Sequence, residues 1–171
     1  AIDASLIENP PALQKFLDQR FVLHAQFNDG VLAYQHDGTA IAATPRLPEL
    51  IGVNYLDRDY LKGALTEGKS TIGKPVIGKI LKAPLFLIAV PIRDRQGTVI
   101  GALAGVTNLG KPNFLDKITE SRYGKTGGYL IVAPTYRLIV TATDKSRVMQ
   151  TLPDTGIQPT RERFLEGYEG P

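Results

Sequence analysis

The sequence contains no cysteine and no tryptophan, and it has one methionine and two histidines among its 171 residues. Without cysteine the chain has no thiolate nucleophile, no cysteine-based zinc or iron–sulfur site and no disulfide. The two histidines, His24 and His36, are too few to favour a zinc site. The absence of cysteine leaves the compartment open, because cytosolic and extracytoplasmic proteins can both lack it.

Long apolar runs and clustered charge are also missing. The longest apolar run, residues 84–92, is far shorter than the roughly 20 residues that span a bilayer. The net charge of +3 comes from dispersed lysines and arginines, so no nucleic-acid partner is expected. The first residues do not form a signal peptide. If the protein lies outside the cytoplasm, we expect its targeting segment to have been removed.

The sequence does carry a regular succession of helix and strand signals. Asn9 followed by two prolines is typical of a helix start, and apolar residues at a period near 3.6 extend this helix over residues 10–26. A second helix is predicted over residues 57–67, capped by Asp57. Two β-hairpins with glycine in their turns are predicted, from residues 31–34 with 39–43 and from residues 85–92 with 98–109.

The second hairpin has an unusual composition. Both of its strands are apolar almost throughout, which predicts a central position in a sheet covered on both faces. Its second strand also contains Gly101, Ala102, Ala104 and Gly105. Because these side chains are so small, we expect another element or a ligand to approach the sheet closely there.

A second segment begins after a break at residues 110–112. Its predicted elements are a short helix over residues 113–122, strands over residues 129–133 and 137–143, and a further helix over residues 160–166. The strands needed to close a second sheet are not visible, so we expect a module that is incomplete in this chain. The predicted organisation is an N-terminal helix (residues 1–30), a first module (31–110) and a partial second module (111–171).

Eight residues that begin at Gly63 and end at Ser70 match the phosphate-loop pattern. In such a loop, backbone amides hold the phosphates while Lys69 and Ser70 would contact phosphate oxygens and Mg²⁺. The pattern normally follows a buried strand and opens a helix. Here it ends a predicted helix and runs toward Pro75, which cannot continue one. The context therefore favours a helix terminator, and a nucleotide-hydrolysing enzyme is kept as an alternative.

Arg58 and Tyr60 are the strongest candidates for a binding site. They stand at the start of the second predicted helix, shortly after Tyr55. A guanidinium presents a planar pair of donors to a carboxylate, and tyrosine presents an aromatic wall with one polar tip. Lys74, Lys79 and Lys82 could add a basic rim near the same place, although a solvated face is the simpler interpretation. The competing interpretation is that Arg58 forms an ordinary surface ion pair with a neighbouring aspartate.

Taken in order, several segments resemble the Cache family. They are Gly52-Val-Asn-Tyr55-Leu-Asp-Arg58-Asp-Tyr60-Leu, Ile72-Gly73-Lys74-Pro75, Ala89-Val-Pro91-Ile-Arg-Asp94 and Val99-Ile-Gly101-Ala-Leu-Ala-Gly105-Val-Thr-Asn-Leu109. More narrowly, the chain resembles the double Cache sensor domains of bacterial diguanylate cyclases (GGDEF proteins), sensor histidine kinases and chemoreceptors. The resemblance implies an α+β fold, with PAS-like antiparallel sheet modules and a long N-terminal helix.

The resemblance also implies a site. In amino-acid-binding members an arginine at the start of the helix binds the ligand carboxylate, and aromatic residues follow it; Arg58 and Tyr60 match, whereas Leu61 replaces a second aromatic residue. The acidic residue that holds the α-amino group is replaced by Val106, which disfavours an α-amino acid. The implied ligand is a small polar metabolite, such as a carboxylate. The implied binding residues are Arg58, Tyr60, Tyr55, Lys74, Thr107 and Asn108.

The function implied is that of a non-enzymatic sensor without a cofactor. Such a domain forms the periplasmic part of an inner-membrane receptor and passes a conformational change to a cytoplasmic output domain, such as a GGDEF domain or a histidine kinase. A homodimer through the N-terminal helix is implied as well. Two alternatives stay open, the nucleotide-hydrolysing enzyme described above and a PAS-like interaction domain that binds no ligand.

Overall fold

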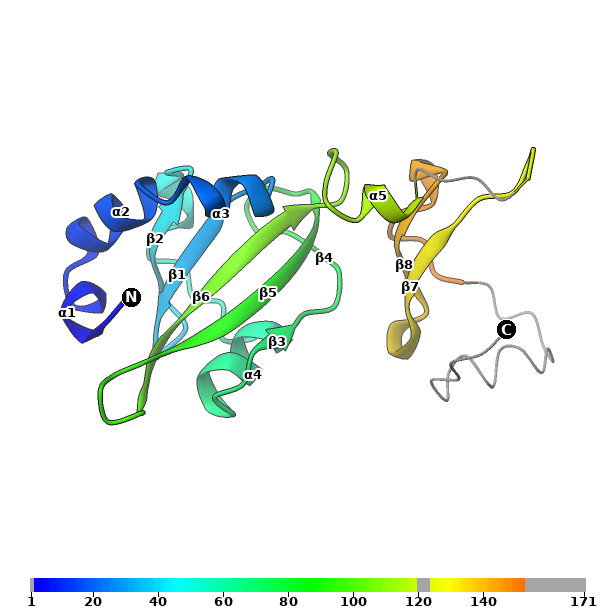
Figure 1. The fold of residues 1–171 in the computed structure, drawn as a ribbon. Coiled ribbons are helices and arrows are strands. Elements are labelled where there is room, and N and C mark those ends of the chain that lie inside the picture. The colour runs from blue at the N-terminus through cyan, green and yellow to red at the C-terminus, as the bar shows by residue number, and fades with distance from the viewer. Residues whose placement is uncertain (1, 120–123, 153–171) are drawn as a thin grey trace. The chain divides into compact units, whose positions relative to one another are not determined.

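The computed structural model describes residues 2–119 and 124–152. The chain divides into two units, Ala1–Phe114 and Leu115–Pro171. The first is built on a six-stranded sheet (Figure 1) with the order β2-β1-β6-β5-β3, in which β4 also pairs with β5. Its strands are β1 (Val31–Gln35), β2 (Ala40–Thr44), β3 (Thr71–Ile72), β4 (Val76–Ile77), β5 (Pro84–Arg93) and β6 (Val99–Asn108).

Both predicted hairpins of this unit are confirmed. β1 pairs antiparallel with β2, and β5 pairs antiparallel with β6 from Leu85↔Asn108 to Arg93↔Val99. The apolar composition of the second hairpin is explained by its place in the middle of the sheet, where β6 lies between β1 and β5. Every main-chain group of a central strand can pair with a neighbour, so the hairpin forms the frame of the unit.

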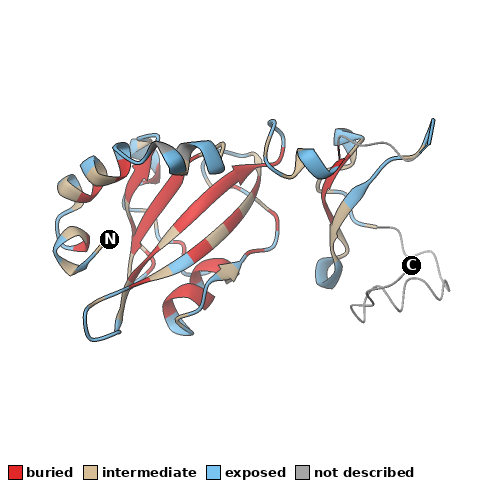
Figure 2. Cartoon of the chain, in the orientation of Figure 1, coloured by how far each residue is buried: buried red, intermediate tan, exposed pale blue. Residues whose placement is uncertain are grey.

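Helices cover both faces of the sheet, as predicted. One face carries α1 (Ala4–Ile7), α2 (Pro10–Asp18) and α3 (Phe21–Gln26); the other carries α4 (Asp59–Thr66) and the 3₁₀ turn η1 (Pro48–Leu50) (Figure 1). Each face has its own apolar core. Leu13 and Leu17 of α2 are fully buried in one, and Leu61 of α4 is fully buried in the other. Figure 2 shows the buried residues concentrated on the sheet and on the inner sides of these helices.

The single helix predicted over residues 10–26 is wrong, because α2 ends at Asp18 and α3 begins at Phe21. Two anchors explain the break. The side chain of Gln14 accepts a hydrogen bond from the amide of Ala43 and donates one to its carbonyl oxygen, which fixes α2 on β2. Phe27, directly after α3, packs on β6, which is separated from β2 by the strand β1. One straight helix could make only one of these two contacts, either that of Gln14 with β2 or that of Phe27 with β6.

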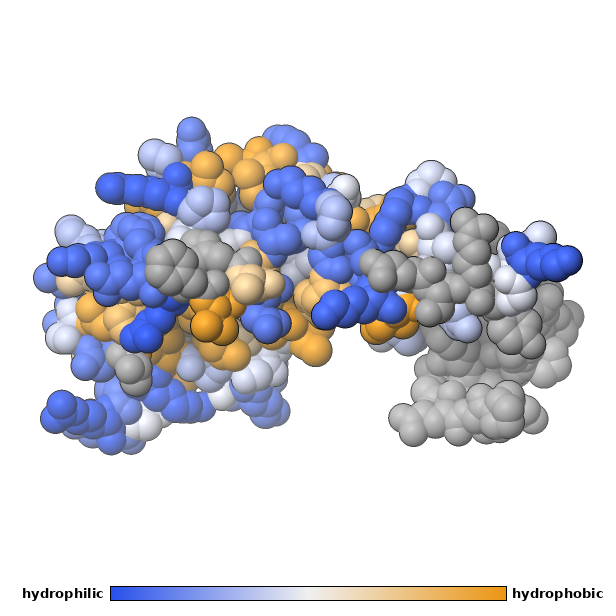
Figure 3. All heavy atoms as spheres, turned by 45° about the horizontal axis from the view of Figure 1, so that its top comes forward, coloured by the Kyte–Doolittle hydropathy of each residue, from blue (hydrophilic) through white to orange (hydrophobic). Residues whose placement is uncertain are grey.

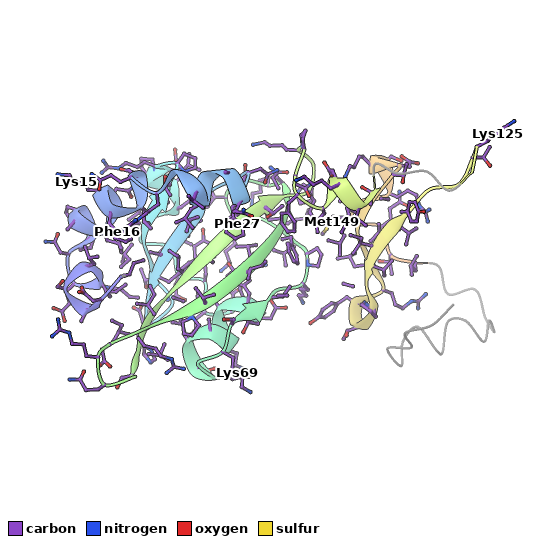
Figure 4. All side chains as sticks on the ribbon, in the orientation of Figure 1. Lys15, Phe16, Phe27, Lys69, Lys125 and Met149 are labelled. Carbon is purple, nitrogen blue, oxygen red and sulfur yellow. The ribbon has the colours of Figure 1, made fainter. Side chains whose placement is uncertain are left out.

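Phe27 explains why β6 contains such small residues. A Cβ atom built on Gly105 would come within 2.2 Å of the Phe27 ring, and one built on Gly101 would come within 2.4 Å of the carbonyl oxygen of Tyr34. The position of Phe27 at the end of α3 is seen in Figure 4. The predicted close approach to the sheet is therefore confirmed, and the partners are a side chain and a neighbouring backbone.

The second unit contains α5 (Asp116–Thr119), β7 (Leu130–Ala133), η2 (Pro134–Tyr136), β8 (Leu138–Ala142) and η3 (Lys145–Arg147). β7 and β8 pair antiparallel, which confirms the two strands predicted in this segment. The predicted helix over residues 113–122 is shorter in the described chain and corresponds to α5. The helix predicted over residues 160–166 lies outside the described residues.

Two tyrosines form a polar contact inside the core of the first unit. Tyr34 is fully buried and Tyr60 is 2% exposed. The Tyr34 hydroxyl donates a hydrogen bond to the Tyr60 hydroxyl. Burial raises the pKa of Tyr60 to about 12 and raises the pKa of Tyr34 well above its ordinary value. Both phenols are therefore neutral donors and acceptors under ordinary conditions.

The buried tyrosine pair predicts a loss of stability at alkaline pH. Because the pKa of Tyr60 is raised from 10.0 to about 12 in the folded state, its contribution is fully present below pH 10 and is lost as the pH rises toward 12, by at most about 3 kcal/mol. Denaturant unfolding at pH 8, 10 and 11.5 should show this decline. Tyr60→Phe should make it shallower, while Tyr34 and Tyr55, whose pKa values are also raised, retain part of it. An equal decline in the variant would contradict the assignment.

The Phe27–Gly105 contact predicts a specific destabilisation. Gly105→Ala should lower the free energy of unfolding by about 1–3 kcal/mol, because the added methyl group overlaps the Phe27 ring. In a Phe27→Ala background the same substitution should cost much less, since the space is then open. Urea unfolding of the two single variants and the double variant measures the coupling. Additive effects would show that the ring does not limit this position.

Candidate ligand-binding site

A pocket lies against the sheet face that carries α4. Its walls come from β1, η1, the start of α4, β4, β5, β6 and the turn after β4. The space open to the centre of a water molecule is about 40 Å³, which is enough for one or a few waters. Most of the wall is aliphatic, and its members from the sheet and from η1 are Leu32, Leu50, Val76, Leu85, Leu87 and Val106.

Arg58 is one of two cations in this wall. It occupies the N-cap position of α4, in extended backbone conformation, and makes no side-chain cap. Its side chain is only 21% exposed, and its Nε lies 3.9 Å from Oδ2 of Asp57. Within the described part of the chain, the guanidinium donates no hydrogen bond. A mostly buried guanidinium with unused donors is a natural partner for a carboxylate.

The helix start differs from the prediction in one respect, because Asp57 does not cap α4. Its Oδ1 instead accepts a hydrogen bond from Nζ of Lys79, at 2.6 Å. This hydrogen bond is the main reason why the pKa of Asp57 lies below its ordinary value. The predicted capping function is therefore wrong. The helix begins later than predicted, at Asp59, so Arg58 holds the N-cap position and Asp57 lies one residue before it.

Lys79, the second cation, lines the pocket from the turn after β4. Besides Asp57, its Nζ donates to the carbonyl oxygen of Asn54 at 3.1 Å and lies 5.1 Å from the centre of the Tyr55 ring. Cations are attracted to the face of an aromatic ring at such distances. The sequence suggested Lys79 as one member of a basic rim near Arg58, but it did not identify Asp57 and Asn54 as its partners.

Three tyrosines line the inner part of the pocket. The rings of Tyr34 and Tyr55 meet edge to face, with centroids 5.7 Å apart and planes at 74°. Burial raises the pKa of Tyr55 as well, so all three phenols are neutral. Tyr60 completes the set from the first turn of α4. Together they offer aromatic surface and neutral hydroxyls beside the guanidinium.

Three of the six predicted site residues meet in this pocket, namely Arg58, Tyr60 and Tyr55. The structure does not bring Lys74, Thr107 or Asn108 to it. Lys74 is exposed, and its backbone amide donates to a carboxylate oxygen of Asp59. Its position therefore supports the loop after β3 rather than the pocket wall.

Thr107 and Asn108 are excluded from the pocket by the geometry of β6. Successive residues of a strand point to opposite faces, so Val106 lines the pocket and Thr107 faces the other side. The backbone amide and carbonyl of Asn108 are hydrogen-bonded by the side chain of Asn28, and its side chain donates to Asp29. These residues fix the chain after α3 to the end of β6.

Sequence reasoning missed Tyr34 and undervalued Lys79. Tyr34 lies in the mostly apolar strand β1, and the sheet face to which its ring points is decided by the pairing of β1 with β6. Lys79 is 22 residues from its partner Asp57. The only signal for it is the short glycine-lysine repeat at residues 72–79, which indicates an irregular loop and gives no pairing.

The phosphate-loop pattern has no phosphate-binding geometry here. It starts within α4, at Gly63, and passes through Gly68 at a φ of +64° before β3. The side chain of Lys69 is 76% exposed and lies 3.8 Å from a carboxylate oxygen of Glu67. Since the pattern closes a helix instead of opening one, its backbone amides cannot converge on an anion in the required way.

Metal binding and membrane insertion by the described residues can also be considered. Within residues 2–119 and 124–152, no three acidic, histidine or cysteine side chains come together to hold a metal ion. In the same part of the chain, every helix is too short or too polar to cross a bilayer.

Comparison with known proteins gives the family. The family model for the Cache domain (dCache_1) matches residues 4–169. No curated protein sequence matches this chain. Among solved structures, the ligand-binding domain of the Pseudomonas aeruginosa amino acid chemoreceptor PctB, in complex with L-arginine, has a TM-score of 0.65 and 25% identity, over 88% of this chain and 62% of that one.

Two further structures share the fold. The sensor domain of the Vibrio cholerae histidine kinase DctB has a TM-score of 0.65 and 14% identity over 96% of this chain and 60% of that one. An extracellular ligand binding receptor from Desulfohalobium retbaense has a TM-score of 0.69 and 11% identity, over 90% and 27%. The chain thus spans less than two thirds of each. With the pocket, the two sheet faces and the family match together, the chain belongs to the Cache domain family, whose members are ligand-binding sensor domains rather than enzymes.

Proposed function

We propose that this chain is the extracytoplasmic ligand-sensing part of a bacterial transmembrane receptor and that it binds a small carboxylate beside Arg58. One observation supports this most strongly: a guanidinium only 21% exposed lines an apolar pocket and donates no hydrogen bond within the described chain. Leaving such a group without an acceptor is costly. A ligand carboxylate would supply the missing acceptor.

The rest of the pocket favours a carboxylate without an ammonium group. No aspartate or glutamate stands among the described residues that line it. Val106, at the position where amino-acid-binding relatives are expected to have an acid, contributes an aliphatic wall. The α-ammonium group of an amino acid would therefore lose its hydration without gaining a counter-charge. PctB and related chemoreceptors with bound amino acids share the fold, and we infer a different ligand class for this chain.

The proposed signal leaves the pocket through β6. Val106 lines the pocket, and the next residue toward the N-terminus of the strand, Gly105, is in contact with Phe27 on the opposite face. A ligand that shifts β6 would act directly on the chain that follows α3. It can change the output only by as much as its affinity differs between the two states.

The larger receptor is proposed from the family. We propose a periplasmic position, a membrane tether and a cytoplasmic output domain, either a GGDEF domain or a histidine kinase, with pairing of two copies through the N-terminal helices. In support of the pairing, Val22 of α3 is 73% exposed. On the side of the helices, Figure 3 shows hydrophobic residues reaching the surface in small groups between hydrophilic ones.

A second function, an interaction domain without a ligand, is favoured by the small size of the pocket. The open space of about 40 Å³ is less than a carboxylate with several carbon atoms requires. In this alternative the side chains of residues 79–81 fill the pocket permanently. The two functions differ in whether any carboxylate stabilises the chain.

Matched acids test the proposed ligand class. We expect thermal stabilisation by propionate, 4-methylpentanoate or another simple carboxylate, and none by the amino acid with the same carbon skeleton, such as L-alanine or L-leucine at equal concentration. The reason is that the pocket offers cations and apolar surface but no acid. A thermal-shift screen followed by calorimetry measures both. Stabilisation by the amino acids alone would contradict the proposal, and no stabilisation by any acid would favour the interaction domain.

Arg58→Ala tests the site. For the carboxylate found in that screen, the substitution should weaken binding by about 10- to 100-fold, the effect of losing a hydrogen bond to a charged group. Arg58→Lys keeps the charge but loses the paired donors, so its Kd should lie between that of the unsubstituted chain and that of Arg58→Ala. The exposed Arg95 in the β5–β6 turn provides the control, and Arg95→Ala should leave the Kd unchanged. Equal Kd values for Arg58→Ala and the unsubstituted chain would refute the site.

A further inference from the structure

We propose that Lys79 latches a flap, residues 76–82, over the pocket, and that a ligand enters only while this latch is open. The inference rests on the proposed function for its biological meaning. The contact of Lys79 with residues 54–57 can be tested without any ligand. It assigns to Lys79 and Asp57 control over access to a pocket whose binding group is Arg58.

The flap has few attachments of its own. β4 pairs with β5 only at Val76↔Leu85 and Ile77↔Pro84. Beyond it, the amide of Gly78 donates to the carbonyl of Ala83, and the amide of Lys82 donates to the carbonyl of Gly78. The bonds from Gly78 onward join the base and tip of the flap to each other. They hold the shape of the turn but do not fix it to the floor of the pocket.

Lys79 supplies the contact across the mouth. Its Nζ reaches three groups on one loop, the carboxylate of Asp57 at 2.6 Å, the carbonyl oxygen of Asn54 at 3.1 Å and the ring of Tyr55 at 5.1 Å. Between residues 54–57 and residue 79 the chain passes through α4, β3 and β4. One side chain therefore joins two segments that are distant in sequence, and both segments border the pocket.

The neighbouring side chains are suited to a movable cover. Ile80 and Leu81 line the pocket, yet they are 40% and 37% exposed. They cover the opening without being packed into the core. With the flap in this position the open space is about 40 Å³, so a ligand with several carbon atoms requires the flap to move outward. Breaking the Lys79 contacts is the smallest change that permits this.

Amide hydrogen exchange on the unliganded chain tests the latch. Lys79→Met keeps the aliphatic stem over Tyr55 and removes the charge. It should speed exchange of the two hydrogen-bonded amides of the turn, those of Gly78 and Lys82, by about three- to tenfold. A turn released from residues 54–57 is open to water and unfolds locally more often, by the amount expected for one partly exposed ion pair with its hydrogen bonds. Asp57→Asn should do the same. Peptides from β5 and β6 should exchange as before, which shows that the fold is intact.

Lys69→Met is the matched control, because Lys69 also pairs with an acid, Glu67, but lies away from the pocket. It should leave exchange in residues 78–82 unchanged. The exchanged pair Asp57→Lys with Lys79→Asp should restore slow exchange only in part, because an aspartate at position 79 cannot donate to the carbonyl oxygen of Asn54. Unaltered exchange in both Lys79→Met and Asp57→Asn would overturn the latch. Because no ligand is present, this result is independent of whether a carboxylate binds at Arg58.

Discussion

The mostly buried guanidinium of Arg58 is the charge around which the pocket of the first unit is organised. A cation moved from water into an apolar wall loses hydration and needs partners. The chain supplies one acid, Asp57, at 3.9 Å, and shares that acid with Lys79. Around Arg58, aliphatic side chains and neutral phenols take the remaining places. In the proposed function, the carboxylate of a ligand would supply Arg58 with the acceptor that Asp57 shares with Lys79.

The central strand β6 connects this pocket with the helices on the other side of the sheet. Its alternation places Val106 in the pocket wall and Gly105 under the ring of Phe27. Because interiors are close-packed, a displacement on one face of such a strand must be accommodated on the other. The small residues of β6 allow Phe27 to pack closely on the strand. In the proposed function, only the strand itself would then separate a ligand beside Val106 from the chain that follows α3.

The sequence allowed the frame of the fold to be predicted, because hairpins and their turns are set by neighbouring residues. Arg58, Tyr55 and Tyr60 were also predictable, since they follow one another at the start of α4. The errors have long-range causes. The helix break depends on contacts of Gln14 and Phe27 with different strands. Thr107 was misplaced because a shift of one residue along a strand reverses the face.

Charge balance links the latch to the ligand class. In the unliganded chain two cations, Arg58 and Lys79, share the single carboxylate of Asp57. A proposed ligand with one carboxylate would give the pocket two cations and two anions. Arg58 would then bind the ligand, Lys79 would keep its bond to Asp57, and the proposed flap could close again. An α-ammonium group would add a third cation to a wall that has no acid among its described residues. The proposed latch and the proposed ligand class, a monocarboxylate with an apolar body, therefore follow from one balance of charges.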